Sequence, residues 1–141
     1  MKTVILDTNV LSELFRKDEA VVARLSKVDR ILISPIVEGE LLAGFRWGSK
    51  LEKNLAVWSA FLEEPFVEKL FIGSETAERY SLIWTQLRKN GTPIPSNDIW
   101  IAAQACECGH ELLSFDGHFE KIEGLLWTLL ERSTSDEPRE S

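Results

Sequence analysis

Carboxylate side chains in separate parts of the chain are the residues best suited to do chemistry together. They are Asp7, Glu40, Asp98 and Asp116. Each one either follows a short apolar run typical of a buried strand or lies in the first turns of a predicted helix. If the strands are parallel, their carboxyl ends share one edge of the sheet, which is where open α/β sheets bind ligands. We therefore expect these acids to meet at that edge.

Such an acid cluster requires a counter-charge, because like charges a few ångströms apart raise each other's pKa and oppose folding. A divalent cation supplies that charge. Oxygen ligands of this number and hardness suit Mg²⁺ or Mn²⁺ better than Zn²⁺. One or two such ions can activate water and stabilise a leaving oxygen in phosphodiester hydrolysis, with paired ions ~3.5–4 Å apart.

Each acid taken alone also has a structural interpretation. Asp7 can cap the helix that Thr8 begins, and Asp98 can interact with the dipole at a helix start. Asp116, which precedes Gly117, can be a turn residue. Glu40 is harder to explain in this way, because its apolar neighbours predict that it faces inward. The joint placement of the acids favours the functional interpretation.

The elements that must position these acids alternate along the chain. Short apolar runs predict strands at residues 4–6, 30–33, 66–72, 112–114 and 125–130. Helical spacing and capping residues predict helical segments at residues 8–15, 18–28, 34–47, 51–62, 74–90, 96–108 and 116–122. This alternation predicts an α/β fold, a three-layer α/β/α sandwich with a central parallel sheet of about five strands.

Composition bounds the remaining possibilities. The 141 residues are enough for one domain, which we place at residues 1–131, followed by a disordered polar tail at 132–141. No apolar run could span a membrane, and the N-terminus does not resemble a signal peptide. Cys106 and Cys108 should point to different faces of a helix and stay unpaired, which suits a reducing cytoplasm. A net charge of −7 argues only weakly against a nucleic-acid partner, because bound cations would cancel part of it.

Four blocks of the sequence contain the predicted acids and their neighbours. The blocks are Val4–Glu13, Ser34–Gly44, Asp98–Ala105 and Leu113–Phe119. These blocks resemble PIN-domain nucleases, in the order that the family has them. The chain is especially similar to the VapC-type toxins of bacterial and archaeal toxin–antitoxin pairs, and the resemblance runs from residue 2 to about 126, nearly the whole predicted domain.

This resemblance implies a Mg²⁺- or Mn²⁺-dependent endoribonuclease that cleaves single-stranded RNA. Asp7 and Asp98 would be the primary metal ligands, and Asp116 and Glu40 would complete the site directly or through water. Asn9 and Ser114 match polar positions beside the acids, where they would hydrogen-bond to the ligands. The resemblance also implies a homodimer, silenced by a cognate antitoxin whose chain enters the active-site groove.

Other residues are candidates for contacts with the substrate. Trp47 and Trp100 can stack on unpaired bases, although core or interface packing is the simpler interpretation. His118 is a candidate general base, but activation of water by a metal needs no histidine, so it is not among the predicted site residues. The candidate phosphate contacts are Arg16, Lys17, Arg46, Lys50, Lys53, Arg88 and Lys89.

The same residues allow two rival functions. A haloacid-dehalogenase-like phosphatase would use Asp7 as its nucleophile, but that chemistry needs a second acid where this chain has Asn9. A PIN-fold interaction module without activity is the other alternative. The presence of all the acids argues against such a loss of function.

Overall fold

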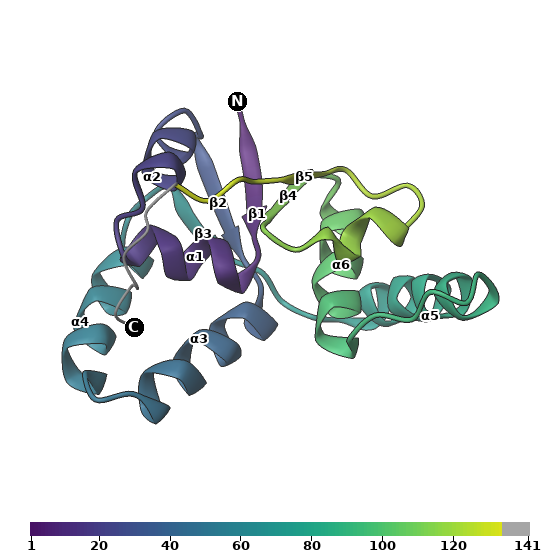
Figure 1. The fold of residues 1–141 in the computed structure, drawn as a ribbon, viewed down its shortest axis with the longest axis horizontal. Coiled ribbons are helices and arrows are strands. Elements are labelled where there is room, and N and C mark those ends of the chain that lie inside the picture. Colours follow the sequence, from purple (N-terminus) through teal and green to yellow (C-terminus); the bar gives the residue numbers. More distant parts are fainter. Residues whose placement is uncertain (134–141) are drawn as a thin grey trace.

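A parallel sheet forms the centre of the molecule (Figure 1). The structure is a computed structural model and describes residues 1–133. Its five strands have the order β3-β2-β1-β4-β5, and each neighbouring pair is parallel. The predicted parallel α/β sandwich is therefore confirmed. The strands are β1 (Thr3–Leu6), β2 (Arg30–Ile33), β3 (Val67–Lys69), β4 (Glu111–Ser114) and β5 (Trp127–Leu129).

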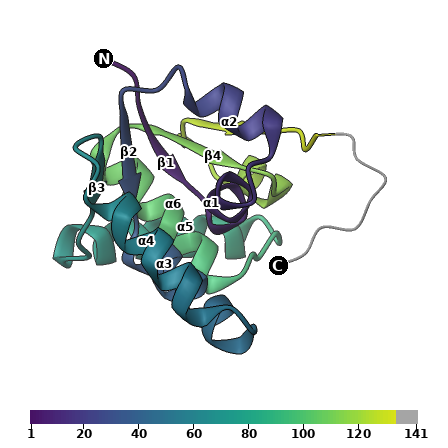
Figure 2. The same ribbon diagram turned by 90° about the vertical axis from the view of Figure 1, so that its left-hand side faces the viewer.

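Helices cover both faces of this sheet (Figures 1 and 2). Right-handed crossovers place the helices that connect β1, β2 and β3 on one face and the two before β4 on the other. The first group is α1 (Thr8–Phe15), α2 (Glu19–Leu25), α3 (Pro35–Trp47) and α4 (Leu51–Leu62). The second group is α5 (Ser74–Lys89) and α6 (Ser96–Cys108), and a 3₁₀ helix, η1 (Gly117–Lys121), follows β4.

The core lies where the central strands meet the helices. Ile5 and Leu6 of β1 and Leu112 and Leu113 of β4 have no exposed surface, because helices cover these strands on both faces. The α6 helix packs close to the sheet through small side chains, and Ala102 is completely buried. The central strands and α6 therefore form the most deeply buried part of the fold.

The edge strands are shorter than predicted. The strand expected at residues 66–72 is β3 at Val67–Lys69, and Phe71 beyond it is 84% exposed. The strand expected at 125–130 is β5 at Trp127–Leu129. Each edge strand has one neighbour only, so its pairing ends as soon as the adjacent strand ends.

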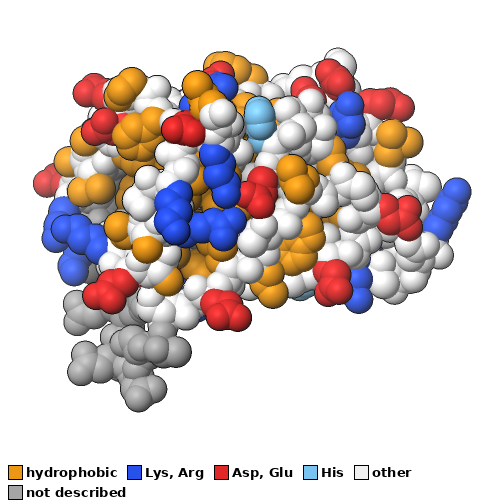
Figure 3. Space-filling view, turned by 90° about the horizontal axis from the view of Figure 1, so that it is seen from above, with side chains coloured by type: hydrophobic (Ala, Val, Ile, Leu, Met, Phe, Trp, Pro, Cys, Tyr) orange, Lys and Arg blue, Asp and Glu red, His pale blue; other side chains and the backbone are white. Residues whose placement is uncertain are grey.

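The carboxyl ends of β1 and β4 mark the position for a ligand. These strands are neighbours, but the chain leaves β1 toward β2 and leaves β4 toward β5, in opposite directions across the sheet. Such a switch point opens a crevice at the carboxyl edge of the sheet. Figure 3 shows the molecule from the other side, where the strands begin and Lys and Arg side chains gather beside acids. Lys2 and Arg24 at this amino edge lie 3.9 and 3.8 Å from Glu111.

The end of the described chain packs against the first two helices. Arg132 forms an ion pair with Glu13, with 2.9 Å between Nη1 and Oε1. Ser133 donates a hydrogen bond to Asp18 at the start of α2. The first two residues of the predicted tail thus have partners, and the rest of it, residues 134–141, lies outside the described residues. Cys106 and Cys108 are free thiols, as predicted. In residues 1–133 no helix has the length and apolar character needed to cross a membrane.

Candidate active site

Asp7 lies directly after β1, at the carboxyl edge of the sheet. Its side chain is 6% exposed and also caps α1, because Oδ1 accepts a hydrogen bond from the Thr8 backbone N–H at 2.8 Å. The other oxygen, Oδ2, accepts a hydrogen bond from the Ser114 hydroxyl at 2.6 Å. The structural and the functional interpretations of Asp7 are therefore compatible. The hydrogen bond from the Thr8 N–H orients the Asp7 carboxylate, and one edge of this carboxylate faces the site.

Ser114, at the end of β4, connects two of the acids. Its completely buried hydroxyl donates to Asp7 and accepts a hydrogen bond from the Asp116 backbone N–H at 2.9 Å. Asn9 links the first turn of α1 to the residue after β4, because its Oδ1 accepts a hydrogen bond from the Phe115 backbone N–H at 3.4 Å. Ser114 thus makes the predicted hydrogen bond to an acid, whereas Asn9 contacts the backbone next to Asp116.

Glu40 reaches the site from α3. Ser34 caps this helix by accepting a hydrogen bond from the Ile36 N–H, and Pro35 follows in the first turn. Glu40 is exposed, so the prediction that it faces the core is wrong. Its oxygens instead accept hydrogen bonds from Thr8 Oγ1 and Asn97 Nδ2, each at 2.9 Å.

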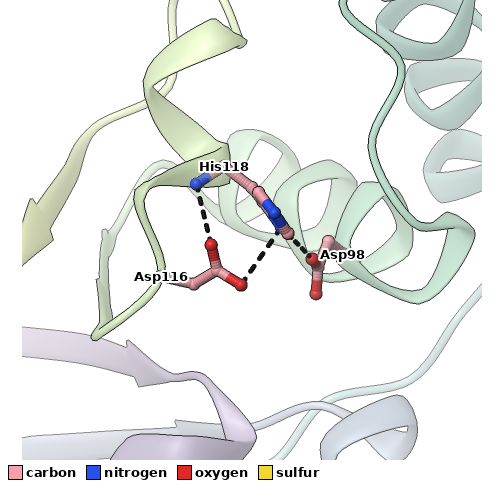
Figure 4. Close-up of side chains that lie close together, drawn as sticks. All are labelled: Asp98, Asp116 and His118. Atoms are coloured by element: carbon pink, nitrogen blue, oxygen red, sulfur yellow. Dashed lines mark hydrogen bonds and ion pairs between the residues drawn. The ribbon is translucent and has the colours of Figure 1, made fainter.

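Asp98 and Asp116 face each other across a histidine (Figure 4). Asp98 is 8% exposed in the first turn of α6, which begins at Ser96 with Pro95 as its N-cap. Asp116 accepts a hydrogen bond from the His118 backbone N–H at 2.9 Å. The His118 Nδ1 atom lies 3.2 Å from Asp98 Oδ2 and 3.1 Å from Asp116 Oδ2. Sequence reasoning left this histidine out. The Asp116-Gly117-His118 turn was the one signal that could have placed it near the acids.

The acids act on one another electrostatically. The pKa of the Asp7 carboxyl is raised from 3.8 to about 6, and burial is the largest cause. The hydrogen bonds from Ser114 and Thr8 lower this pKa, and the charges of Asp98 and Glu40 raise it. Burial also raises the pKa of Asp98, as do the charges of Asp116 and Glu40. The structure thus brings all the predicted acids into one electrostatic cluster.

This donor set fits a hard divalent cation. Among the described residues, neither lysine nor arginine forms an ion pair with any of the four acids. Two buried carboxyls with raised pKa values therefore lack a permanent counter-charge, and a cation that ionises them would relieve the cost. The site offers carboxylate oxygens, which Mg²⁺ and Mn²⁺ prefer.

Other candidate residues separate into two groups. Arg16, Lys17, Lys50 and Lys53 line a groove beside Glu40 and Thr8, between α1, α3 and α4. Arg88 lies elsewhere, on α5, with its guanidinium 4.6 Å from the Trp84 ring.

The two candidate tryptophans also differ in their surroundings. Trp100 stacks on Tyr80 with 4.2 Å between ring centres, which agrees with a packing role. Trp47 is 94% exposed, so it is not part of the core.

Comparison with known proteins agrees with this fold. The sequence profile of the PIN domain matches residues 4–125. The chain therefore belongs to the PIN-domain family. Ribonuclease VapC1 of Rickettsia felis is 32% identical over 127 residues, which cover 86% of this chain and 92% of that protein.

Solved structures place the chain near VapC proteins as well. The DNA-bound VapBC of Salmonella typhimurium is 29% identical, with a TM-score of 0.80 over 91% of this chain and 98% of that one. VapBC2 of Rickettsia felis, bound to a DNA fragment from its promoter, is 25% identical. Its TM-score is 0.80, and the match covers 89% of this chain and 97% of that one.

Proposed function

We propose that this protein is the toxin of a toxin–antitoxin pair, an endoribonuclease that hydrolyses phosphodiester bonds of single-stranded RNA with Mg²⁺ or Mn²⁺. The observation that carries the proposal is the acid cluster at the switch point of a PIN fold. Its carboxylates are coupled to one another and lack a lysine or arginine partner within residues 1–133. We propose residues 1–131 as the nuclease domain.

In this proposal, Asp7 and Asp98 hold the cation, and Asp116 and Glu40 complete the site directly or through water. When bound, a divalent cation lowers the pKa of water and stabilises negative charge on the phosphate. The other residues of the site hold the carboxylates of Asp7 and Glu40 in position. Ser114 Oγ and the Thr8 N–H fix both oxygens of Asp7. Thr8 Oγ1 and Asn97 Nδ2 fix both oxygens of Glu40, so little reorganisation is needed when the substrate binds.

The groove beside Glu40 is the proposed path of the RNA backbone. It has a volume of about 440 Å³, and four cations line it although the whole chain carries a charge of −7. Lys50 and Lys53 lie on its far side, at the start of α4. Phosphates that run from the acid cluster along this groove would meet positive charge at each step.

The proposed activity is tested by cleavage of a fluorescent single-stranded RNA by the purified full chain. We expect cleavage with Mg²⁺ or Mn²⁺, none with excess EDTA, and a loss of at least about 100-fold in Asp98→Asn. Glu63→Gln changes an exposed acid at the C-cap of α4 that does not line the groove, and this matched control should cleave at the wild-type rate. Full activity in chelated buffer, or in Asp98→Asn, would show that the proposal is wrong, and an inactive wild type would favour the interaction module.

The groove is tested separately by RNA binding in the Asp98→Asn background. Lys50→Ala/Lys53→Ala should weaken binding and reduce the slope of log K against log salt by ~1.4, at ~0.7 per lost phosphate contact. Arg88→Ala/Lys89→Ala removes the same charge outside the groove and should leave the slope unchanged. Equal slopes for both double variants would reject the groove as the RNA path and leave the nuclease assignment intact.

We propose an antitoxin protein as the partner and a homodimer as the state in solution. The support for the antitoxin is the likeness to proteins solved as VapBC. An arginine from the antitoxin would be complementary to the acid cluster, so inhibition would be partly electrostatic. The two free thiols and the RNA substrate favour the cytoplasm as the compartment. Co-expression with a short neighbouring gene should relieve growth inhibition if the pairing is right.

A further inference from the structure

His118 occupies the space between two proposed metal ligands (Figure 4). We propose that its Nδ1 atom is a direct ligand of the divalent cation, together with Asp98 and Asp116. The consequence is that the centre prefers Mn²⁺ to Mg²⁺. This inference rests on the metal centre of the proposed function and adds a residue and a metal preference to it.

The positions of the ligand atoms support a shared ion. One atom from each of Asp98, Asp116 and His118 lies within 4.8 Å of the other two. The imidazole Nδ1 is 3.2 Å from Asp98 Oδ2 and 3.1 Å from Asp116 Oδ2. Adjacent ligands of one octahedral ion, each ~2.1 Å from it, are separated by ~3.0 Å. The nitrogen therefore already has the spacing of a neighbouring ligand to both carboxylates.

The local backbone holds the imidazole in this position. The His118 N–H donates to Asp116 Oδ1 at 2.9 Å, which fixes the turn that begins η1. The next residue, Phe119, is completely buried and anchors η1 to the core. The side chain of His118 is 49% exposed, so its ring can reach the ion without displacing core atoms.

Ligand chemistry turns this geometry into a metal preference. Mg²⁺ takes oxygen ligands almost exclusively and keeps several waters, so an imidazole adds little to its binding. Nitrogen donors favour first-row transition ions over Mg²⁺, and Mn²⁺ is a first-row ion that suits carboxylate-rich sites. Replacing His118 should therefore weaken Mn²⁺ binding and leave Mg²⁺ binding nearly unchanged.

The chain contains its own control. It has two histidines, and the other one, His110, directly precedes β4 at the amino edge of the sheet, away from the acids. His110→Gln removes the ring that precedes β4, and His118→Gln removes the same ring from η1, which follows β4. Any effect that follows the loss of His118 only must come from its position in the site.

The decisive measurement is electron spin echo modulation of Mn²⁺ bound to the full chain. We expect coupling to a directly bound ¹⁴N in the wild type and in His110→Gln, and its loss in His118→Gln. Wild-type protein labelled with ¹⁵N-histidine should show the ¹⁵N pattern, so the test holds even if a variant does not fold. By calorimetry, His118→Gln should bind Mn²⁺ at least about 10-fold more weakly, with a change of less than about 2-fold for Mg²⁺.

The possible failures are distinguishable. Mn²⁺ bound without nitrogen coupling would overturn the inference and leave an all-oxygen metal centre, with His118 as an ion-pair partner of the acids. Mn²⁺ that does not bind to the wild type would overturn both the inference and the metal-dependent function. An equal loss of Mn²⁺ and Mg²⁺ affinity in His118→Gln would assign the residue a structural role only.

Discussion

Asp7 is a buried residue that carries a negative charge when it is ionised, and this burial determines its pKa. Burial disfavours the ionised form, and the raised pKa near 6 expresses that cost. A bound cation requires the ionised form, so the metal and the proton compete for the same carboxylate. Loss of cation affinity as the pH falls below about 6 follows directly from this competition.

The first prediction is a dependence of stability on pH without metal. Because the pKa of Asp7 is higher in the folded chain than in the unfolded one, the folded state binds more protons between pH 3.8 and about 6. The free energy of unfolding in EDTA should therefore rise as the pH falls through this window. The Asp7 contribution is at most about 3 kcal/mol, from a pKa shift of about 2 at 1.36 kcal/mol per pH unit.

Urea unfolding in EDTA at a series of pH values measures this effect. Asp7→Asn keeps the shape of the side chain and removes its titration. The free energy of unfolding of the variant minus that of the wild type should therefore decrease as the pH falls from 7 to 4. A difference that stays constant over that range would mean that the Asp7 carboxyl titrates alike in both states.

Ser114 gives the second prediction. Its hydroxyl donates to Asp7 and thereby lowers the pKa of that carboxyl, while it also accepts from the Asp116 N–H. Ser114→Ala should raise the pKa of Asp7 further and weaken Mn²⁺ binding about 10–100-fold at pH 7. Ser114→Thr retains the hydroxyl and should bind within about 3-fold of wild type. Calorimetry compares them, and equal affinity of the Ala and Thr variants would contradict the role of the hydroxyl.

At the scale of elements, Glu40 joins three helices at one point. Thr8 of α1 and Asn97 of α6 each donate to this side chain of α3. The third prediction is that Thr8→Val/Asn97→Ala lowers the rate of RNA cleavage about 10-fold and changes stability by about 1 kcal/mol or less, because these hydrogen bonds are exposed.

A cap on the same helix provides the opposite case. Ser34 is completely buried and accepts from the Ile36 N–H, so Ser34→Ala should cost about 1 kcal/mol of stability and keep the cleavage rate per folded molecule. Rates from initial velocities and free energies from urea unfolding separate the two effects. If Ser34→Ala slowed cleavage and Thr8→Val/Asn97→Ala did not, the hydrogen bonds to Glu40 would not support catalysis.

The central strands were predictable because their short, continuous apolar runs indicate strands that are buried on both faces. The apolar runs of β1, β2 and β4 are buried on both faces, and only a covered parallel sheet accommodates them. The ends of β3 and β5 were not predictable, because an edge strand ends where its neighbour ends. The same limit applies to the site. The strand ends predicted that Asp7 and Asp116 lie at one edge of the sheet, but the position of His118 between Asp98 and Asp116 depends on a turn that spacing does not determine.

The whole molecule gathers charges that are far apart in the chain. Asp7 and Asp116 are brought together only by the pairing of β1 with β4, and Asp98 joins them only when α6 packs on the sheet. The unfolded chain has no such site. A cation that binds the site must therefore favour the folded state as a whole.

The fourth prediction is stabilisation of the full chain by metal. At a free cation concentration 100 times its Kd, binding adds about 2.7 kcal/mol, which should raise Tm by roughly 5–10 °C for a chain of this size. Differential scanning calorimetry with Mn²⁺ against EDTA measures the shift, which should grow with the logarithm of cation concentration. Asp98→Asn should abolish it, because the cation loses a ligand, while Glu63→Gln should retain it. A shift of equal size in Asp98→Asn would place the stabilising ion outside the acid cluster.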